Sequence, residues 1–522
     1  MVSWHGTDLH QDVLGVGADP YIYVWFFAWW PYAISHHLDP LFTHLLWQPG
    51  GLNLGWTTSV PVLALLAYPI TALFGPLAAY DALMVAAPAC AALSAYALCL
   101  HLCRKPGAAL VGGWVFGFSS YTAAHINEHL NLEWTALLPL LVLVALRRMQ
   151  GQGKRRGTVV ALALLLAAQA GIAIELLATS CLMAALAWLL AWWRLPDWRK
   201  RLWLLAQDVM LAAPLTLLLL APLLWAMFGR PHDLALPKMW PEFFSIDPLN
   251  FFFPTFTTWL GGHAFMPLTS YFGGTWGEQT GYLGLPMMFI VWRYLRRASG
   301  FARWVFLCTM LLSLGPVLVI HSSPTFLILP WRIMLSLPLL NKALPARMMV
   351  YAFLLAGLFT ALWLAGTTSR WRWLAAGLAV MWLWPAPAPV EAIPVQRFFN
   401  KTEIMQYLGP DRRVLVLPWG IKSPSMYWQV TSGFSYSQVG GYLVFPPARV
   451  QADGVLMKLF FDMIGPDTLA DLKAYALASG VQDVIVVPGT DPRLAAGIAG
   501  WGWPARQVDG VSLYTAPSPN PQ

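Results

Sequence analysis

Apolar stretches close to the length of a membrane-spanning helix recur along this chain between positions 57 and 390. A helix of about 20 apolar residues crosses the hydrocarbon core of a bilayer, and helices satisfy their backbone hydrogen bonds internally in lipid. Charged residues make up 11% of the chain, whereas soluble proteins contain about a quarter. The sequence therefore predicts a polytopic α-helical membrane protein.

Short clusters of Lys and Arg separate the apolar stretches, and such clusters mark cytoplasmic loops. Spans drawn between the clusters alternate across the bilayer without conflict, so we expect about 10 to 12 transmembrane helices. The same topology explains the net charge of +8, because a nucleic-acid site would instead gather its basic residues on one solvated face. We therefore expect the lipid bilayer, and no nucleic acid, as a partner. The clusters lie at 104–105, 147–156, 194–201, 293–303 and 370–372.

Three segments depart from this pattern. Pro61 and Pro69 predict a bent or re-entrant helix over 57–75, and Pro330 and Pro338 predict an interfacial or re-entrant helix over 325–340. The first 20 residues lack the apolar core of a signal peptide. Since the scheme starts outside the cytoplasm, we expect a further transmembrane helix before this sequence.

The composition divides the chain into three predicted domains. Residues 1–56 form an extracytoplasmic first loop with amphipathic helices, residues 57–390 the transmembrane domain, and residues 391–522 a soluble extracytoplasmic domain. In the last of these, strand-like segments at 412–420 and 481–489 flank a helical segment at 466–480. This order predicts a small α/β domain.

Asp19 precedes Pro20 and a run of aromatic residues in the predicted first loop. A carboxylate at the mouth of an interfacial helix can act as a general base on a sugar hydroxyl. It can equally bind a divalent cation that neutralises a phosphate, and Mg²⁺ and Mn²⁺ are the candidate cofactors. The structural alternative is an N-cap for a helix that starts at Pro20.

The segment HINEHLNLEW, at 125–134, gathers His125, Glu128 and His129 at an expected extracytoplasmic turn. On a helix the two histidines would share one face, as metal ligands do. The spacing also matches an inverted zincin pattern, in which Glu128 would be the base of a hydrolase. Because the sequence identifies no third ligand, we favour a polar loop that lines a sugar or phosphate site.

Three further ionisable residues lie where spans should meet the extracytoplasmic side. They are Glu175, Glu278 and Arg347. A positive-inside protein seldom keeps cations on this side, so we expect Arg347 to bind the phosphate of a lipid-linked donor. The alternative is that its side chain reaches outer-leaflet head groups. For the two glutamates, the alternative is simple solvation.

The layout resembles the GT-C superfamily of membrane glycosyltransferases, and in particular bacterial YfhO-like and protein-mannosyltransferase-like proteins. The resemblance implies transfer of a sugar, with inversion, from a polyprenyl-phosphate donor to an envelope glycan, lipid or protein acceptor. It also implies that Asp19 is the base or metal ligand, and that Glu128 with His125 or His129 is a second polar group. The stretches that carry the resemblance include GADPYIYVWFFAWWPYAISHHLDPLF, HINEHLNLEW, EQTGYLGLP, LPARMMV and MYWQVTSGFSYSQVGGY.

We therefore expect a bacterial inner-membrane glycosyltransferase whose active site and C-terminal domain face away from the cytoplasm. Asp19, Glu128 and His129 are the predicted catalytic residues, and His125, Glu175, Glu278 and Arg347 the predicted substrate-binding residues. Two alternatives stay open. One is a polytopic transporter, although the middle spans show few mid-membrane polar residues and no repeat. The other is a non-catalytic factor in envelope-polysaccharide assembly.

Overall fold

The computed structural model describes residues 12–231, 240–409, 411–443 and 446–517. These residues form two compact units, each assembled from separate stretches of the chain. We call residues 82–220 and 240–389 the helical unit. Residues 12–81, 221–231 and 390–517 form the mixed unit.

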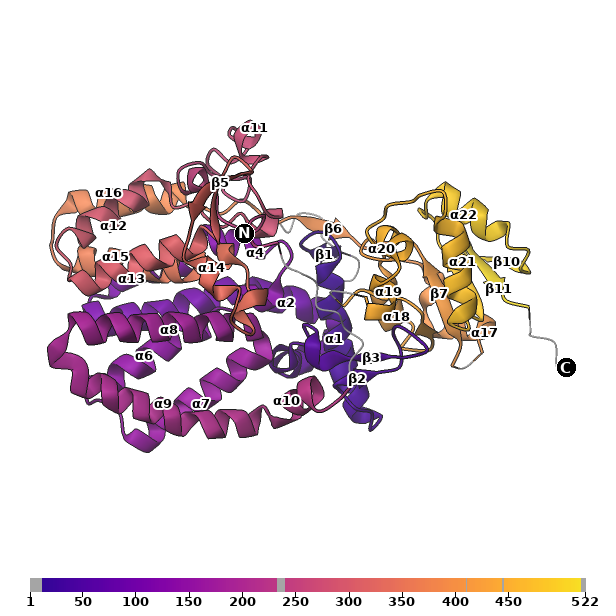
Figure 1. Ribbon diagram of the computed structural model, residues 1–522, viewed down its shortest axis with the longest axis horizontal. Coiled ribbons are helices and arrows are strands. Elements are labelled where there is room, and N and C mark those ends of the chain that lie inside the picture. The colour runs from indigo at the N-terminus through magenta and orange to yellow at the C-terminus, as the bar shows by residue number, and fades with distance from the viewer. Residues whose placement is uncertain (1–11, 232–239, 410, 444–445, 518–522) are drawn as a thin grey trace. The chain divides into compact units, whose positions relative to one another are not determined.

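Apolar helices that lie side by side make up most of the helical unit, as Figure 1 shows for α6 to α9. Short 3₁₀ and α-helical turns join them. The long helices are α3 (Pro106–Gly117), α6 (Leu137–Met149), α7 (Arg155–Ile172), α8 (Ile174–Arg194), α9 (Arg199–Leu219), α12 (Gly284–Leu295), α13 (Gly300–Ser313), α15 (Met349–Ala365) and α16 (Arg370–Trp382). The short ones are α4 (Ser120–His125), α5 (Leu130–Glu133), η2 (Pro196–Trp198), η3 (Pro248–Phe251), α11 (Met266–Thr269), η4 (Trp276–Glu278), α14 (Trp331–Met334), η5 (Leu340–Lys342) and η6 (Pro345–Met348).

Among the described residues, 6 helical segments are long and apolar enough to cross a membrane. This is the organisation of a multi-pass membrane protein. Most of the other expected spans are also helices, but α3, α12 and α16 have only 12 or 13 residues, about 20 Å at 1.5 Å per residue. The expected total of 10 to 12 crossings stays a prediction. The segments are Pro61–Cys103, Leu130–Met149, Arg155–Ile172, Ile174–Arg194, Pro196–Leu219 and Pro345–Ala365.

Helix α2 (Pro61–Cys103) contains the expected bend in its first half. The bend lies at Gly75, where φ is 87°, rather than at Pro61 or Pro69. A residue without a Cβ adopts this left-handed conformation at little cost. The sequence boundary between the two units falls within this helix, after Asp81.

Helix α15 lies at the centre of the helical unit. In the segment Pro345–Ala365, 78% of an 18-residue apolar stretch is buried. In Ile174–Arg194 the corresponding share is 22%. Gly112 of α3 and Gly357 of α15 allow the two backbones to touch, because a Cβ on Gly112 would lie 2.6 Å from the carbonyl oxygen of Gly357. Small residues at such crossings are typical of helices packed in membranes.

One buried carboxylate ties three of these helices together at the end that carries the basic clusters. Asp208 of α9 is fully buried and accepts hydrogen bonds from Nε of Arg148 at 2.5 Å and from Nε of Arg155 at 2.8 Å. Arg148 lies in the last turn of α6 and Arg155 opens α7. Charge and hydrogen bonding together compensate the cost of burying this carboxylate.

The segment 325–340 is not the helix that its apolar pattern predicts. Strands β4 (Val317–Ile320) and β5 (Ser323–Ile328) form an antiparallel hairpin instead, and only the short α14 and η5 follow. His321 and Ser322 both have positive φ, of 51° and 61°, as in the two-residue turns that favour hairpins. Pro330 and Pro338 then limit helix growth.

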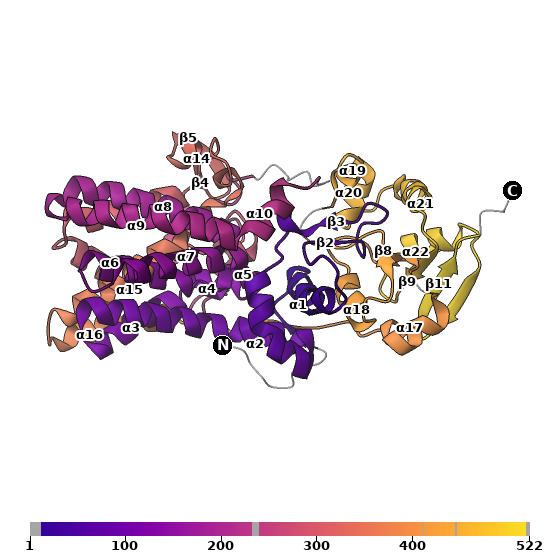
Figure 2. The ribbon, with the colours of Figure 1, turned by 90° about the horizontal axis from the view of Figure 1, so that it is seen from below.

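The mixed unit contains a five-stranded sheet in the order β10–β11–β9–β7–β8. The central β7 pairs in parallel with β8 and β9, whereas β11 runs antiparallel to β9 and β10. Helices α17, α21 and α22 lie beside this sheet (Figure 2). The strands are β7 (Arg413–Leu417), β8 (Ser437–Gln438), β9 (Asp483–Val486), β10 (Ala505–Val508) and β11 (Val511–Thr515). The two segments expected to be strands are β7 and β9, and the expected helix is α21 (Thr468–Ala478).

Residues 12–35 also belong to the mixed unit. Strand β1 (Asp12–Leu14) pairs with β6 (Val390–Ala392), and helix α1 (Asp19–Ser35) packs against α18 (Ser425–Thr431). The remaining elements of this unit are β2 (Phe42–Thr43), β3 (Leu52–Asn53), η1 (Leu54–Trp56), α10 (Ala221–Phe228), η7 (Arg397–Phe399), α17 (Lys401–Tyr407), α19 (Ala448–Gln451), α20 (Gly454–Phe460) and α22 (Pro492–Ala499).

Candidate functional site

A buried ionic cluster in the helical unit brings together three residues that the sequence singled out. The guanidinium of Arg347 donates to Oε1 of Glu278 through Nε at 3.0 Å and through Nη2 at 2.5 Å. Its Nη1 donates to Oε2 of Glu175, whose Oε1 accepts from the backbone N–H of Leu344 at 2.9 Å. Arg347 is thus held by two carboxylates, and this group of three carries one more negative than positive charge.

His125 lies against the same cluster at the end of α4 and is fully buried. Its Nδ1 lies 2.9 Å from the carbonyl oxygen of Tyr121. Because a carbonyl only accepts, Nδ1 carries the proton and Nε2 presents a lone pair. Burial and the nearby Arg347 guanidinium lower the pKa of His125 to about 3, so the imidazole is neutral. Its Nε2 lies 3.9 Å from Oε2 of Glu278.

His129 completes a group of three possible metal ligands with His125 and Glu278. One ligand atom from each residue lies within 4.8 Å of the others. The two histidines do not share one continuous helix, since His125 ends α4 and His129 precedes α5 as its N-cap residue, yet their ring centroids are 5.6 Å apart. Glu128 is not one of the three, and its Oε2 lies 3.8 Å from Nε2 of His129.

The ionic cluster lies at the opposite end of α8 from the nearest basic cluster. Glu175 is in the first turn of this 21-residue helix and Arg194 in its last turn. A helix of this length spans about 30 Å, close to the hydrocarbon thickness of a bilayer. The predicted site residues of the helical unit therefore lie one membrane thickness away from residues expected to face the cytoplasm.

Asp19 belongs to the mixed unit and is the first residue of α1. The N-cap position is Ala18, and among the described residues no side chain makes a capping hydrogen bond there. Asp19 is therefore the first residue of the helix rather than its expected N-cap. Oδ1 of Asp19 instead accepts a 2.7 Å hydrogen bond from the hydroxyl of Tyr442. A carboxylate in the first turn also interacts favourably with the helix dipole.

Gln429 of α18 fixes α1 beside the C-terminal part of the mixed unit. This buried amide accepts from the indole N–H of Trp25 at 2.8 Å and donates to the carbonyl oxygens of Leu45 and Tyr436 at 2.9 and 3.0 Å. The hydrogen bonds with Trp25 and Leu45 join segments far apart in the sequence, whereas the one to Tyr436 closes a local turn. The register of Asp19 against Tyr442 therefore rests on a satisfied buried polar network.

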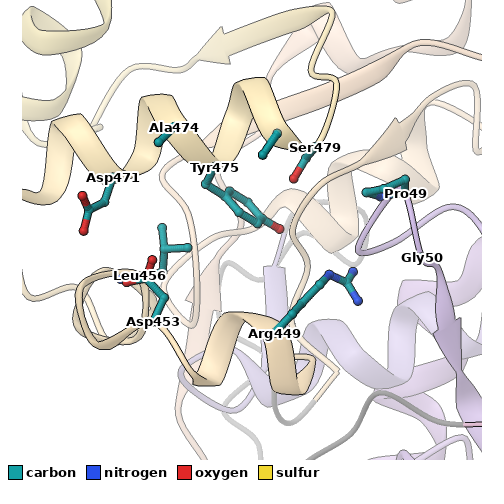
Figure 3. A pocket seen from close by; sticks show the side chains of 10 residues that line it. Pro49, Gly50, Arg449, Asp453, Leu456, Asp471, Ala474, Tyr475 and Ser479 are labelled. Atoms are coloured by element: carbon teal, nitrogen blue, oxygen red, sulfur yellow. Dashed lines mark hydrogen bonds between the residues drawn. The ribbon is translucent and has the colours of Figure 1, made fainter.

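The mixed unit also has an open pocket of about 570 Å³ (Figure 3). Arg449 and Tyr475 extend into it from α19 and α21, with Asp453 and Asp471 at its edge. The Arg449 side chain donates to the carbonyl oxygen of Trp47 at 2.5 Å, and the Tyr475 hydroxyl donates to that of Val439 at 2.6 Å. These side chains give the pocket both hydrogen-bond donors and acceptors. No motif in the sequence predicts this pocket, because its lining residues come from four separate segments.

Several buried polar residues of the helical unit were not anticipated from the sequence. The hydroxyl of Tyr351 in α15 forms a 2.8 Å hydrogen bond with the hydroxyl of Thr179 in α8, and the carbonyl oxygen of Tyr121 accepts a hydrogen bond from His125. Glu133 is fully buried, and neither of its carboxylate oxygens has a hydrogen-bond partner among the described residues. Glu133 lies in the apolar segment Leu130–Met149. A carboxylate in such a segment is rare, and this rarity could have identified Glu133 from the sequence.

No family model matches this sequence, and no curated protein matches it. Solved structures are similar in fold. The arabinofuranosyltransferase AftD from Mycobacteria matches 97% of this chain and 40% of its own chain, with a TM-score of 0.55 and 15% sequence identity. This chain thus spans 40% of the AftD chain.

Two other structures match with lower TM-scores. The oligosaccharyltransferase AglB from Archaeoglobus fulgidus, in complex with an inhibitory peptide and a dolichol-phosphate, matches 98% of this chain and 71% of its own, with a TM-score of 0.47 and 12% identity. ArnT from Cupriavidus metallidurans, bound to undecaprenyl phosphate, matches 98% of this chain and 96% of its own, with a TM-score of 0.37 and 14% identity. Of the three, the AftD match bears on the fold. This chain therefore has the fold seen in the matched part of the AftD structure.

Proposed function

We propose that this protein is a membrane glycosyltransferase that moves a sugar from a polyprenyl-phosphate donor to an envelope glycan, lipid or protein acceptor. The observation that carries the proposal is the hydrogen bond from Tyr442 to the carboxylate of Asp19, in a chain with the AftD fold. The reaction takes place on the extracytoplasmic face of a bacterial inner membrane, the side to which Asp19 and the ionic cluster are assigned by the distribution of basic residues.

Asp19 is the general base of the proposed reaction. The oxygen of an acceptor hydroxyl bonds to the anomeric carbon of the donor while the bond from that carbon to the phosphate oxygen breaks. The electron pair leaves with polyprenyl phosphate, and the hydroxyl proton passes to the Asp19 carboxylate. The hydrogen bond from Tyr442 to Oδ1 orients the Asp19 carboxylate that accepts this proton. Divalent-cation binding by Asp19, with Mg²⁺ or Mn²⁺, stays the second role proposed for it.

In this proposal the ionic cluster of the helical unit binds the polyprenyl-phosphate sugar. Arg347 keeps hydrogen-bond donors beyond those that it gives to Glu175 and Glu278, because a guanidinium has five N–H groups and these three hydrogen bonds use three of them. Glu175 and Glu278 orient the guanidinium, and His125 adds a fixed polar edge. Glu128 and His129 are partly exposed and are the polar groups proposed to reach the substrate.

Release of polyprenyl phosphate from purified full-length protein in proteoliposomes tests the proposal. A panel of polyprenyl-phosphate sugars is supplied, with and without Mg²⁺ or Mn²⁺. We expect turnover with at least one donor, and a loss of about 100-fold or more in Asp19→Asn, the range expected for removal of a general base. Asp509→Asn is the matched control, because Asp509 is exposed and its φ of 47° suits asparagine equally well.

Absence of release from every donor by folded protein would contradict the transferase proposal and would favour a transporter or an assembly factor. Full turnover in Asp19→Asn with turnover intact in Asp509→Asn would keep the transferase and reject Asp19 as its base.

A further inference from the structure

Two lone-pair atoms face each other in the interior of the helical unit. Nε2 of His125 and Oε2 of Glu278 are both buried, and neither has a hydrogen-bond partner among the described residues. Their separation of 3.9 Å is too long for a hydrogen bond. The proton of the imidazole is on Nδ1, which is held by the carbonyl oxygen of Tyr121. Two acceptors thus converge on one point without a donor between them, an arrangement that a bound cation would satisfy.

Each of these two ligands is oriented by a second group on its far side. Tyr121 fixes the ring of His125 through Nδ1, and Arg347 fixes the carboxylate of Glu278 through Oε1. Metal-binding histidines and carboxylates characteristically have such outer partners, which set the tautomer and aim the free atom. The outer partners leave one atom of His125 and one of Glu278 available at the same place.

His129 approaches the same point, and the local backbone provides room for its ring. A Cβ at Gly277, the residue before Glu278, would lie 3.1 Å from Nδ1 of His129 and 3.2 Å from Oε2 of Glu128. A side chain at position 277 would crowd the second histidine, so glycine lets η4 lie close to it without moving either side chain. The three ligand atoms, all within 4.8 Å of one another, need only small side-chain rotations to reach one ion.

The charge of the surroundings favours a cation at this point. Glu175 and Glu278 face the single guanidinium of Arg347, which leaves one unmatched negative charge in a buried group. An unmatched charge in a low-dielectric interior is costly. A divalent cation beside Oε2 of Glu278 would offset it.

We propose that His125, His129 and Glu278 bind one divalent transition-metal ion of the Zn²⁺ class. Two imidazole nitrogens and one carboxylate oxygen form a ligand set that suits Zn²⁺ and Co²⁺, whereas Mg²⁺ and Ca²⁺ prefer oxygen ligands alone. Three protein ligands leave at least one coordination position for a further group. The site involves neither Asp19 nor the hard-cation role proposed for that residue. It shares His125, His129 and Glu278 with the proposed donor-binding cluster, but retention of a metal ion can be measured without glycosyl transfer.

Metal content of the purified full-length chain, with any purification tag removed, tests this site. The protein is stripped with a chelator, reloaded with Zn²⁺, Co²⁺ or Mg²⁺ alone, and passed through a desalting column. We expect one tightly held Zn²⁺ or Co²⁺ per chain by elemental analysis, no retained Mg²⁺, and a visible Co²⁺ absorption that Zn²⁺ abolishes. Glu278→Gln and His129→Asn should each weaken Co²⁺ binding by more than about 100-fold, since loss of an outer partner alone costs 10- to 100-fold.

Two matched variants separate ligand loss from general damage. Glu175→Gln removes a carboxylate from Arg347 but no proposed ligand, and His263→Asn removes an exposed histidine. Both should retain Co²⁺ within about 10-fold of the wild-type affinity. His129→Asn keeps the test valid if Glu278→Gln does not fold, because the His129 ring is partly exposed. Folded wild-type protein that retains neither Zn²⁺ nor Co²⁺, or an unchanged Co²⁺ spectrum in folded His129→Asn, would overturn the proposal.

Discussion

The hydroxyl of Tyr442 donates a 2.7 Å hydrogen bond to Oδ1 of Asp19, although 423 positions separate the two residues in the sequence. Asp19 opens the first long helix, whereas Tyr442 follows a strand of the five-stranded sheet. The residue proposed as general base is therefore oriented by the C-terminal part of the chain. The mixed unit contains both α1 and the residues after 390, so the C-terminal residues form one compact unit with the N-terminal helix.

Tyr442→Phe removes the hydroxyl that donates this hydrogen bond and keeps the aromatic ring that contacts Phe460. A hydrogen bond to a charged group contributes about 1.5–3 kcal/mol, so we expect kcat for sugar transfer to fall about 10- to 100-fold. The Michaelis constant for the donor should stay nearly unchanged, because Tyr442 is a positioning residue in the proposed reaction. Steady-state kinetics in proteoliposomes provide both constants.

Tyr407→Phe is the matched control, since Tyr407 is 37% exposed and belongs to the same unit. In the double variant Asp19→Asn and Tyr442→Phe, the two losses should not add, because the tyrosine acts through the carboxylate. A fall in both kcat and donor affinity in Tyr442→Phe, or fully additive losses, would contradict this role.

Much of the fold follows from the sequence because lipid imposes a simple rule. Long apolar segments become helices, and α6 to α9 lie where their apolar patterns and basic flanks predicted them. The β4–β5 hairpin escaped prediction because a short apolar segment fits a strand as well as a helix, and a two-residue turn decided between them. The pairing of β1 with β6 joins positions near 13 and 391, and no local pattern encodes such a contact.

The sequence predicts which residues belong to the candidate site, but it does not predict which of them contact one another. Glu175, Glu278 and Arg347 stood out because charges are rare in this chain, and the structure places them in one cluster. Which atoms would meet depends on helix packing. Arg347 was expected to be available to a phosphate, yet two carboxylates bind it. The third possible metal ligand beside His125 and His129 is Glu278, which lies 149 positions after His129 in the sequence.

Arg347→Met should destabilise the helical unit severely. The substitution leaves Glu175 and Glu278 buried without their cation, and loss of one partner of a buried ion pair costs about 3–5 kcal/mol. Arg347→Lys should recover only part of the loss, because an ammonium cannot reproduce the forked contact with Glu278. Thermal unfolding in detergent, followed by a dye or by circular dichroism, measures the difference. Arg332→Met, at an exposed position, is the control, and equal midpoints for Arg347→Met and Arg332→Met would contradict the prediction.

Asp208→Asn should loosen the opposite end of the helical unit. Asp208 is fully buried between Arg148 and Arg155, so its neutral replacement leaves two guanidinium groups facing each other. We expect a loss of about 3 kcal/mol, the lower end of the range for a buried pair, because the two arginine side chains are 18% and 52% exposed. Asp197→Asn, at an exposed site in η2, should change the unfolding midpoint little. Similar midpoints for the two variants would show that Asp208 does not hold α6, α7 and α9 together.

Cysteine labelling tests the predicted orientation in the membrane. The five native cysteines are first replaced, since Cys181 is exposed. Single cysteines are then introduced at Gln152, in the basic turn between α6 and α7, and at Gln507, on the exposed strand β10. Because basic clusters are retained in the cytoplasm, a membrane-impermeant maleimide should label Gln507→Cys in cells with an intact inner membrane. Gln152→Cys should react only after that membrane is disrupted. The reverse pattern would place Asp19 and the sheet on the cytoplasmic side, and the donor would then have to be a cytoplasmic one.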